Sequence, residues 1–97
     1  MDIEMNKAIR TAVETGEVRI GLRETKKAYV AGTLKLVVVA KNCPGDFTDE
    51  IELWDVPIHR TDATNLTLGS ICGKPFNISI LGIVDPGESQ ILRSENP

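Results

Sequence analysis

The residues best suited to chemistry in this chain lie between Val18 and Lys27, where a short alternating apolar run ends at a glycine and a charged helix begins. Gly21 can adopt a positive φ and allows backbone N–H groups to approach a ligand closely. The helix that opens after it offers unpaired amides and a partial positive charge, which together favour an anion. Because Arg23, Lys26 and Lys27 surround this turn, we interpret the anion as a phosphate-bearing polymer rather than a carboxylate metabolite.

Glu24 lies in the same basic turn and has two interpretations. It precedes Lys27 by three residues, so the two side chains can form an ion pair on one helix face. As a carboxylate that only accepts hydrogen bonds, it could instead receive one from the amino group of a base while the cations hold phosphates. The cluster could also be no more than a solvated helix face. The spacing of Arg23 and Lys27, four residues apart at one helix end, favours binding.

The elements that would position this cluster alternate between helices and strands. The first helix has apolar residues at helical spacing, with Asp2 as its expected N-cap, and the nearly continuous apolar run 34–40 is typical of a central strand buried on both faces. Thr48 is expected to cap the third helix, and Pro57 places the third strand near an edge. The expected order is helix 2–15, strand 18–20, helix 22–31, strand 34–40, helix 48–54, strand 56–59, helix 66–72, strand 78–84 and a short helix around residues 91–92. This order predicts an α/β fold, a three-layer α/β/α sandwich with a four-stranded mixed sheet.

Composition and charge set bounds on the partner. Ninety-seven residues, 41% of them hydrophobic and 26% charged, predict one domain over 1–97 with a single core. The net charge of −3 argues against diffuse nucleic-acid binding. The charge is unevenly distributed, however, because residues 1–41 carry +3 and residues 42–97 carry −6. One basic face on an acidic body predicts RNA binding that is local and directed by shape.

Other classes of function have little support in the sequence. No apolar run approaches the ~20 residues of a membrane span, and the start lacks a basic, apolar leader, so we expect a cytoplasmic protein with no membrane partner. Cys43 and Cys72 are not at metal-ligand spacing and suggest free thiols in a reducing compartment. His59 is the single histidine, and no signature of a nucleophile surrounds it. The acids of residues 49–55 do not fit a calcium loop. We therefore expect no enzyme, metal, cofactor or small-molecule substrate.

Four blocks of sequence resemble a known family. Gly21–Ala28 resembles the RNA-contacting turn of the kink-turn-binding family of archaeal and eukaryotic ribosomal and small-ribonucleoprotein proteins. The blocks Asn42–Pro44, Leu68–Lys74 and Ile83–Leu92 are similar to members found in the large ribosomal subunit. The blocks occur in the family's order across nearly the whole chain, so together they are more specific than any one alone.

The resemblance implies a protein that recognises a kink-turn in ribosomal RNA, stabilises its bent form and lies among neighbouring ribosomal proteins. A bulge that kinks an RNA helix exposes sheared G·A pairs and an unstacked base. By this resemblance, Gly21 permits close approach, Arg23 and Glu24 address the edges of the G·A pairs, and Lys27 holds backbone phosphate. No catalytic residue is implied.

The family's second contact is the loop after the fourth helix, here Gly73-Lys74-Pro75-Phe76. An aromatic ring in this loop can stack on the flipped base for ~1–3 kcal/mol, and Phe76 is the candidate. The alternative is that Phe76 belongs to the core. Asn42 would reach phosphate or sugar, although Asn-Cys-Pro is equally a turn signal. The predicted RNA-binding residues are Gly21, Arg23, Glu24, Lys26, Lys27, Asn42, Gly73, Lys74 and Phe76.

Two departures from the family pattern and two alternative functions remain. Arg23 stands where many relatives carry asparagine, and the segment between Asn42 and Leu68 is about four residues, or roughly one helical turn, shorter than in relatives. The nearest alternative function is a kink-turn adaptor of small ribonucleoproteins. Another is a protein-interaction module, since residues 46–55 carry five acids and no base.

Overall fold

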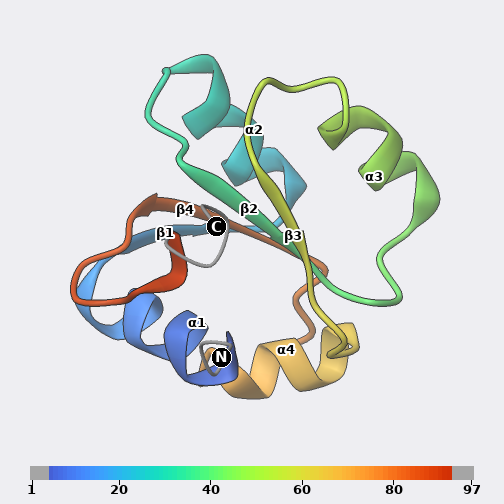
Figure 1. Ribbon diagram of the computed structural model, residues 1–97. Coiled ribbons are helices and arrows are strands. Elements are labelled where there is room, and N and C mark those ends of the chain that lie inside the picture. Colours follow the sequence, from blue (N-terminus) through green and yellow to red (C-terminus); the bar gives the residue numbers. More distant parts are fainter. Residues whose placement is uncertain (1–4, 93–97) are drawn as a thin grey trace.

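The computed structural model describes residues 5–92, which form helices in two layers around one sheet. Figure 1 shows α2 and α3 covering one face of the sheet and α1 and α4 covering the other. The predicted α/β/α sandwich with a four-stranded mixed sheet is confirmed. In chain order the elements are α1 (Met5–Thr15), β1 (Glu17–Ile20), α2 (Leu22–Val30), β2 (Leu36–Val39), α3 (Gly45–Ile51), β3 (Ile58–Arg60), α4 (Asn65–Ile71) and β4 (Ile80–Asp85).

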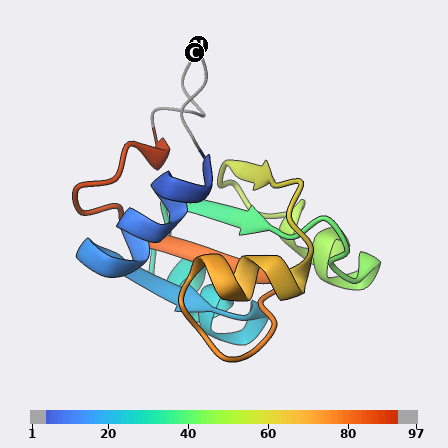
Figure 2. The same ribbon diagram turned by 90° about the horizontal axis from the view of Figure 1, so that it is seen from below.

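The strand order β1-β4-β2-β3 determines where the loops gather. β4 runs antiparallel to both β1 and β2, and β3 runs parallel to β2. The strands β1, β2 and β3 therefore point the same way, and the helices that follow them, α2, α3 and α4, all begin at one end of the sheet. The loop that enters β4 lies at this end too (Figure 2). We call this end, made of Gly21, residues 41–44, residues 61–64 and residues 73–79, the carboxyl edge.

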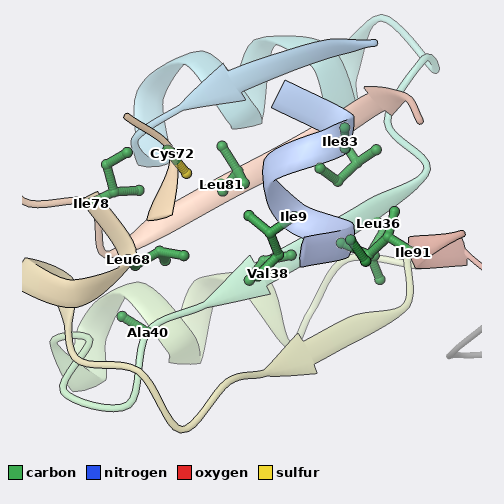
Figure 3. Packing of buried hydrophobic residues seen from close by; sticks show 12 residues of the cluster. Ile9, Leu36, Val38, Ala40, Leu68, Cys72, Ile78, Leu81, Ile83 and Ile91 are labelled. Carbon is green, nitrogen blue, oxygen red and sulfur yellow. The ribbon is translucent and has the colours of Figure 1, made fainter. Parts of the chain in front are cut away.

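The core lies on both faces of the sheet because β2 is buried along its whole length. Leu36 and Val38 point towards α1 and α4 and join the larger cluster shown in Figure 3. Val37 and Val39 point the other way and pack with Ile51 of α3. Because successive side chains of a strand point to opposite faces, this one apolar run packs against both helical layers, as the run 34–40 predicted.

The boundaries of α3, β3 and β4 differ from the predicted ones. The N-cap of α3 is Pro44 rather than Thr48, whose hydroxyl donates to the Gly45 carbonyl, 2.8 Å away, inside the helix. The helix also ends at Ile51, earlier than predicted. β3 begins only after Pro57, which has no N–H to donate, although its carbonyl accepts from Val37 N. β4 begins two residues later than predicted, at Ile80, and extends to Asp85.

The elements predicted at the two ends of the chain lie only partly within the described residues. Ile91 and Leu92 form a single 3₁₀ turn where a final helix was expected, and any continuation of that helix lies outside the described residues. The expected N-cap Asp2 lies outside them as well. Within residues 5–92, no helix has both the length and the apolar character needed to cross a bilayer.

Candidate nucleic-acid interface

Gly21 forms the turn between β1 and α2 and leaves that turn open. Its backbone has φ 90° and ψ 160°, a conformation that few residues other than glycine adopt, so the predicted positive φ is correct. Its N–H donates to the Ile80 carbonyl at 2.9 Å, which anchors the turn to the start of β4. A Cβ at Gly21 would meet no atom within 4 Å. The backbone is therefore accessible to a large ligand at this point.

The buried side of α2 determines which of its side chains face solvent. Thr25 is fully buried, and its methyl group packs so closely on Gly82 of β4 that a Cβ there would lie 2.8 Å away. The Thr25 hydroxyl also donates to the Arg19 carbonyl, 3.5 Å away. With Thr25 inward, the cations of the first turns point outward. They line a shallow groove along the helix, formed by Arg23, Lys26, Lys27, Val30 and Ala31.

The three cations of this groove differ in their partners. Lys27 Nζ lies 3.3 Å from Glu24 Oε2 within α2, and both side chains are more than half exposed. Lys26 Nζ instead lies 2.9 Å from Glu50 Oε2 on α3. Arg23 is exposed and has no ion pair with any other residue in the described range 5–92. An exposed ion pair contributes little free energy. Lys27 and Glu24 can therefore separate at low cost, and each can contact a ligand instead.

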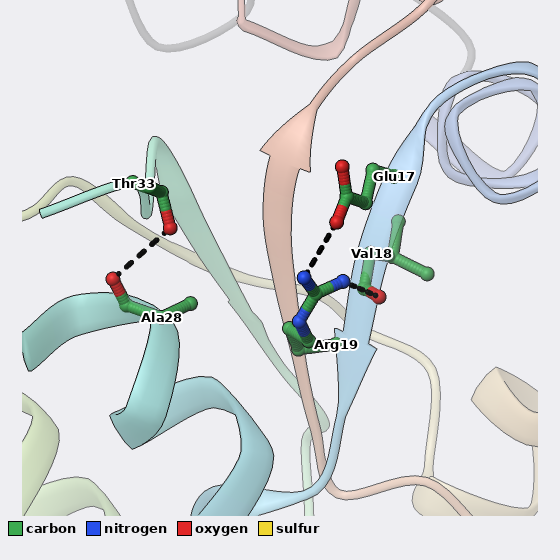
Figure 4. A network of polar contacts seen from close by, with 5 residues as sticks. All are labelled: Glu17, Val18, Arg19, Ala28 and Thr33. Carbon is green, nitrogen blue, oxygen red and sulfur yellow. Dashed lines mark hydrogen bonds and ion pairs between the residues drawn. The ribbon is translucent and has the colours of Figure 1, made fainter. Parts of the chain in front are cut away.

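Arg19, the cation of β1, is already engaged. Figure 4 shows its guanidinium between Glu17 Oε2, at 2.5 Å, and the Val18 carbonyl, at 3.0 Å. At the C-terminal end of α2, the Thr33 hydroxyl donates to the Ala28 carbonyl and so helps to end that helix. Arg23 and Lys27 at the start of α2 are thus more available to a ligand than Arg19.

The loop that carries Phe76 is held against α4 by backbone contacts. The helix ends in a Schellman motif, in which Gly73 at φ 72° and Lys74 donate to the last carbonyls. Gly69 lets the loop fold back, since a Cβ there would lie 2.0 Å from the Phe76 carbonyl oxygen. The Phe76 side chain is 51% exposed, so the alternative of a core aromatic is wrong. Sequence analysis did not identify the packing role of Gly69.

Gly21 and Phe76 lie at the same end of the molecule. Phe76 precedes Ile80 by four residues, and the Ile80 carbonyl accepts the Gly21 N–H. Four residues span at most about 14 Å of extended chain. Figure 2 shows the loop between α4 and β4 passing beside the junction of β1 and α2. The turn and the loop, more than fifty residues apart in sequence, therefore form one surface on the carboxyl edge.

Asn42 is occupied by protein partners at this edge. Its Oδ1 accepts from Asn65 N at 2.7 Å, and its Nδ2 donates to Asn65 Oδ1 at 3.3 Å. Asn65 Nδ2 in turn lies 3.4 Å from Ser79 Oγ, in the loop that follows Phe76. Asn42 thus connects the end of β2, the start of α4 and the Phe76 loop. Sequence analysis missed this role of Asn65, which is the first residue of α4 and follows the N-cap Thr64, whose hydroxyl accepts from Thr67 N.

Among the titratable groups of the described residues, the two thiols have shifted pKa values. Burial raises the pKa of the Cys72 thiol to about 11, partly offset by nearby Lys74. Burial and Asp46 raise the pKa of Cys43, while Arg60 opposes them. Both thiols are protonated at neutral pH and are poor nucleophiles. Among residues 5–92, no three His, Cys, Asp or Glu side chains are grouped so that they could hold a metal ion.

Known proteins match this chain along most of its length. Residues 3–93 match the family described as Ribosomal protein L7Ae/L30e/S12e/Gadd45 family. A protein of Methanosarcina mazei is 42% identical over 92 residues, which cover 95% of this chain and 89% of the relative. One from Methanococcus maripaludis is 41% identical, with 97% and 98% covered, and one from Methanothermobacter thermautotrophicus is 40% identical, with 93% and 96% covered. All three relatives are named large ribosomal subunit protein eL30.

Proposed function

The chain belongs to the ribosomal protein L7Ae/L30e/S12e/Gadd45 family, and from this premise we propose that it is a structural, RNA-binding protein of the large ribosomal subunit that recognises a kink-turn. The family resemblance found in Gly21–Ala28 and the later blocks is thereby confirmed. The named relatives are large-subunit proteins rather than enzymes or small-ribonucleoprotein adaptors, which favours rRNA and neighbouring ribosomal proteins as partners and the cytoplasmic ribosome as location.

One observation carries the kink-turn proposal: the open glycine turn and the exposed ring share the carboxyl edge. Gly21 has space for a ligand at its backbone, and Phe76 is half exposed a few residues from the strand that anchors Gly21. Ordinary A-form RNA offers neither an accessible major groove nor an unstacked base, whereas a kinked bulge offers both. A surface with a narrow basic opening and a free ring fits the second kind of RNA.

The side chains divide into two kinds of contact. Arg23 and Lys27 bind phosphate and the edges of the G·A pairs, and Glu24, released from Lys27, accepts from a base amino group. The ring of Phe76 stacks on the extruded base, and Lys74 beside it adds a phosphate contact. Gly21 and Gly73 let the RNA backbone approach. Asn42 contributes by holding the loop of Phe76 in place.

Stabilisation of the bend follows from differential affinity. The protein shifts the RNA from extended to kinked only by the difference between its affinities for the two forms. Stacking and base-edge contacts exist only in the kinked form, whereas phosphate contacts exist in both. Selectivity therefore resides in Phe76, Glu24 and the base-edge contact of Arg23, and general affinity resides in the phosphate contacts of the cations.

A gel-shift comparison tests the proposal. We expect the protein to bind a kink-turn RNA more tightly than the same duplex with its G·A pairs replaced by Watson–Crick pairs. The variant Arg23→Ala/Lys27→Ala removes two phosphate contacts and should reduce the slope of log affinity against log salt by roughly 1.4–1.8. The matched control Lys7→Ala/Arg10→Ala removes two exposed cations from α1, on the other face, and should leave the slope unchanged.

The results would separate this function from the alternatives. Equal affinity for both RNAs would contradict kink-turn recognition, and equal slopes for both double variants would contradict the assigned surface. An interaction module that uses the acidic residues 46–55, where Leu53 is 85% exposed, would keep its protein partner in the Arg23→Ala/Lys27→Ala variant. Co-sedimentation with large ribosomal subunits, rather than with small guide-RNA particles, distinguishes the adaptor function.

A further inference from the structure

We propose that Glu50 of α3 is a positioning residue that holds Lys26 away from RNA, so that Arg23 and Lys27 alone among the α2 cations contact phosphate. This inference rests on the proposed function and deepens it. Sequence analysis grouped Lys26 with the RNA-binding cations because it lies with Arg23 and Lys27 around the opening turn of the helix. The structure separates the two lysines by directing them at carboxylates on different helices.

Two contacts join α2 to α3 and to the turn that follows α3. Lys26 and Tyr29 are three residues apart on α2, and so they lie on one side of it. Lys26 pairs with Glu50, and Tyr29 stacks on Trp54 with ring centroids 4.8 Å apart and planes 9° from parallel. Trp54 itself is held by a further turn after α3, in which its backbone N–H donates to the Ile51 carbonyl at 2.9 Å. The aromatic stack therefore sets the position from which Glu50 reaches Lys26.

The Lys26–Glu50 pair differs from the Lys27–Glu24 pair in what its opening would cost. The Glu50 side chain is 34% exposed, compared with 51% for Glu24, so loss of its lysine leaves a carboxylate with less water to replace it. The pair also joins two elements that are already held together, so less side-chain freedom is lost when it forms. Lys27 can exchange Glu24 for a phosphate, whereas Lys26 must leave a half-buried partner.

The surroundings of Glu50 add a second cost. Asp46 and Asp49 lie on the same helix, and both are exposed. A phosphate brought to Lys26 would approach these carboxylates and be repelled by them. The acidic helix α3 therefore limits the RNA contact to the side of α2 that carries Arg23 and Lys27. This limit accounts for a narrow basic surface on a chain whose net charge is −3.

The test compares salt slopes for five proteins, the wild type and four variants, on the kink-turn RNA and on its Watson–Crick duplex control. We expect Lys26→Ala to match the wild type, because Lys26 does not contact RNA. Glu50→Gln should release Lys26 and make the slope steeper, by at most roughly 0.7–0.9, the value of one full phosphate contact, since Asp46 and Asp49 still oppose a phosphate there. Glu50→Gln/Lys26→Ala should return the slope to the wild-type value. Asp49→Asn removes the same charge from α3 without releasing Lys26, and it should leave the slope unchanged.

Two results would overturn the inference. A loss of one contact in Lys26→Ala would mean that Lys26 already binds RNA in the wild type. An unchanged slope in Glu50→Gln, with the fold intact by circular dichroism, would mean that Glu50 does not restrain Lys26. Equal binding of the two RNAs by the wild type would contradict kink-turn recognition, while the slopes of the five proteins would still report on Lys26. Absence of binding to both RNAs would contradict both proposals.

Discussion

The two helical layers of this protein are held to the sheet by different means. Under α1 and α4, among the described residues, twelve buried apolar side chains form one cluster, which includes Ile9, Leu68 and Ile83. Under α2 and α3 the buried cluster has only four members. That layer is completed by half-buried side chains, the Tyr29–Trp54 stack and the Lys26–Glu50 ion pair. One layer is mainly apolar, and the other carries polar contacts between its helices.

This difference separates stability from recognition. Burial of apolar area supplies most of the folding free energy, so the α1/α4 layer should dominate stability. The proposed RNA surface draws instead on the start of α2 and on the Phe76 loop, where side chains are exposed. Substitutions in the first region should therefore change the free energy of unfolding and leave RNA affinity intact, whereas truncation of exposed side chains at the start of α2 and in the Phe76 loop should do the reverse.

The largest expected effect is on stability and comes from Ile9→Ala. Ile9 of α1 is fully buried, and its truncation leaves a cavity that should lower the free energy of unfolding by about 2–5 kcal/mol. Denaturant titration measures this loss, and RNA affinity of the folded protein should stay at the wild-type value. Leu53→Ala is the control, since Leu53 is exposed and its truncation should change stability by less than about 0.5 kcal/mol. A small effect of Ile9→Ala would contradict the assigned role of the α1/α4 layer.

Gly21→Ala should affect both quantities, because Gly21 lies at the carboxyl edge and has a backbone conformation reserved for glycine. Strain at φ 90° should lower the free energy of unfolding by about 1–3 kcal/mol, and the added methyl group should hinder RNA approach. Gly45→Ala is the matched control. Gly45 also has open space around it but lacks a positive φ, so alanine there should be neutral or stabilising by about 0.4–1 kcal/mol. Equal stability of the two variants would show that the Gly21 conformation is not required.

Phe76→Ala should have the opposite profile to Ile9→Ala. Loss of the stacking ring should weaken binding to the kink-turn RNA by about 1–3 kcal/mol and leave the Watson–Crick duplex control unaffected. The free energy of unfolding should hardly change, because the ring is half exposed. Phe76→Trp keeps a stacking surface and should retain most of the affinity. If the alanine variant bound both RNAs like the wild type, the ring would have no part in recognition.

Much of this architecture was predictable from the sequence because periodicity and glycine position are local signals. The run 34–40 indicated a strand buried on both faces, and Gly21 marked the end of β1 correctly. The start of α3 was predicted wrongly. Thr48 has the chemistry of a cap, yet the N-cap is Pro44, whose ring fixes φ near the observed −55°, and the helix begins at Gly45.

The candidate site could be predicted as a set of residues but not as an arrangement. Sequence spacing placed Arg23, Lys26 and Lys27 on one turn, and it could not show that Lys26 turns to Glu50, because the contact needs the packing of α2 on α3. In the same way, nothing local shows that Asn42 is bound to Asn65 or that Gly69 makes room for the Phe76 loop. Partners brought together by the sheet are visible only in the folded chain.

The smallest expected effect at neutral pH concerns the two thiols, one in each layer. Cys72 belongs to the buried cluster of the α1/α4 layer, and burial raises its pKa to about 11, whereas Cys43 is partly exposed in the other layer. The folded state therefore keeps the Cys72 proton in a range where the unfolded chain has lost it. Stability should be independent of this group below pH 8 and should fall as the pH rises from about 9 to 11, by roughly 2 kcal/mol in all. Thermal unfolding of the wild type and of Cys72→Ala across this range measures the effect. The difference in stability between the two proteins should be constant near pH 7.5 and should change only at higher pH. Iodoacetamide at pH 8 should label Cys43 before Cys72, and the reverse order would contradict the tighter packing assigned to the α1/α4 layer.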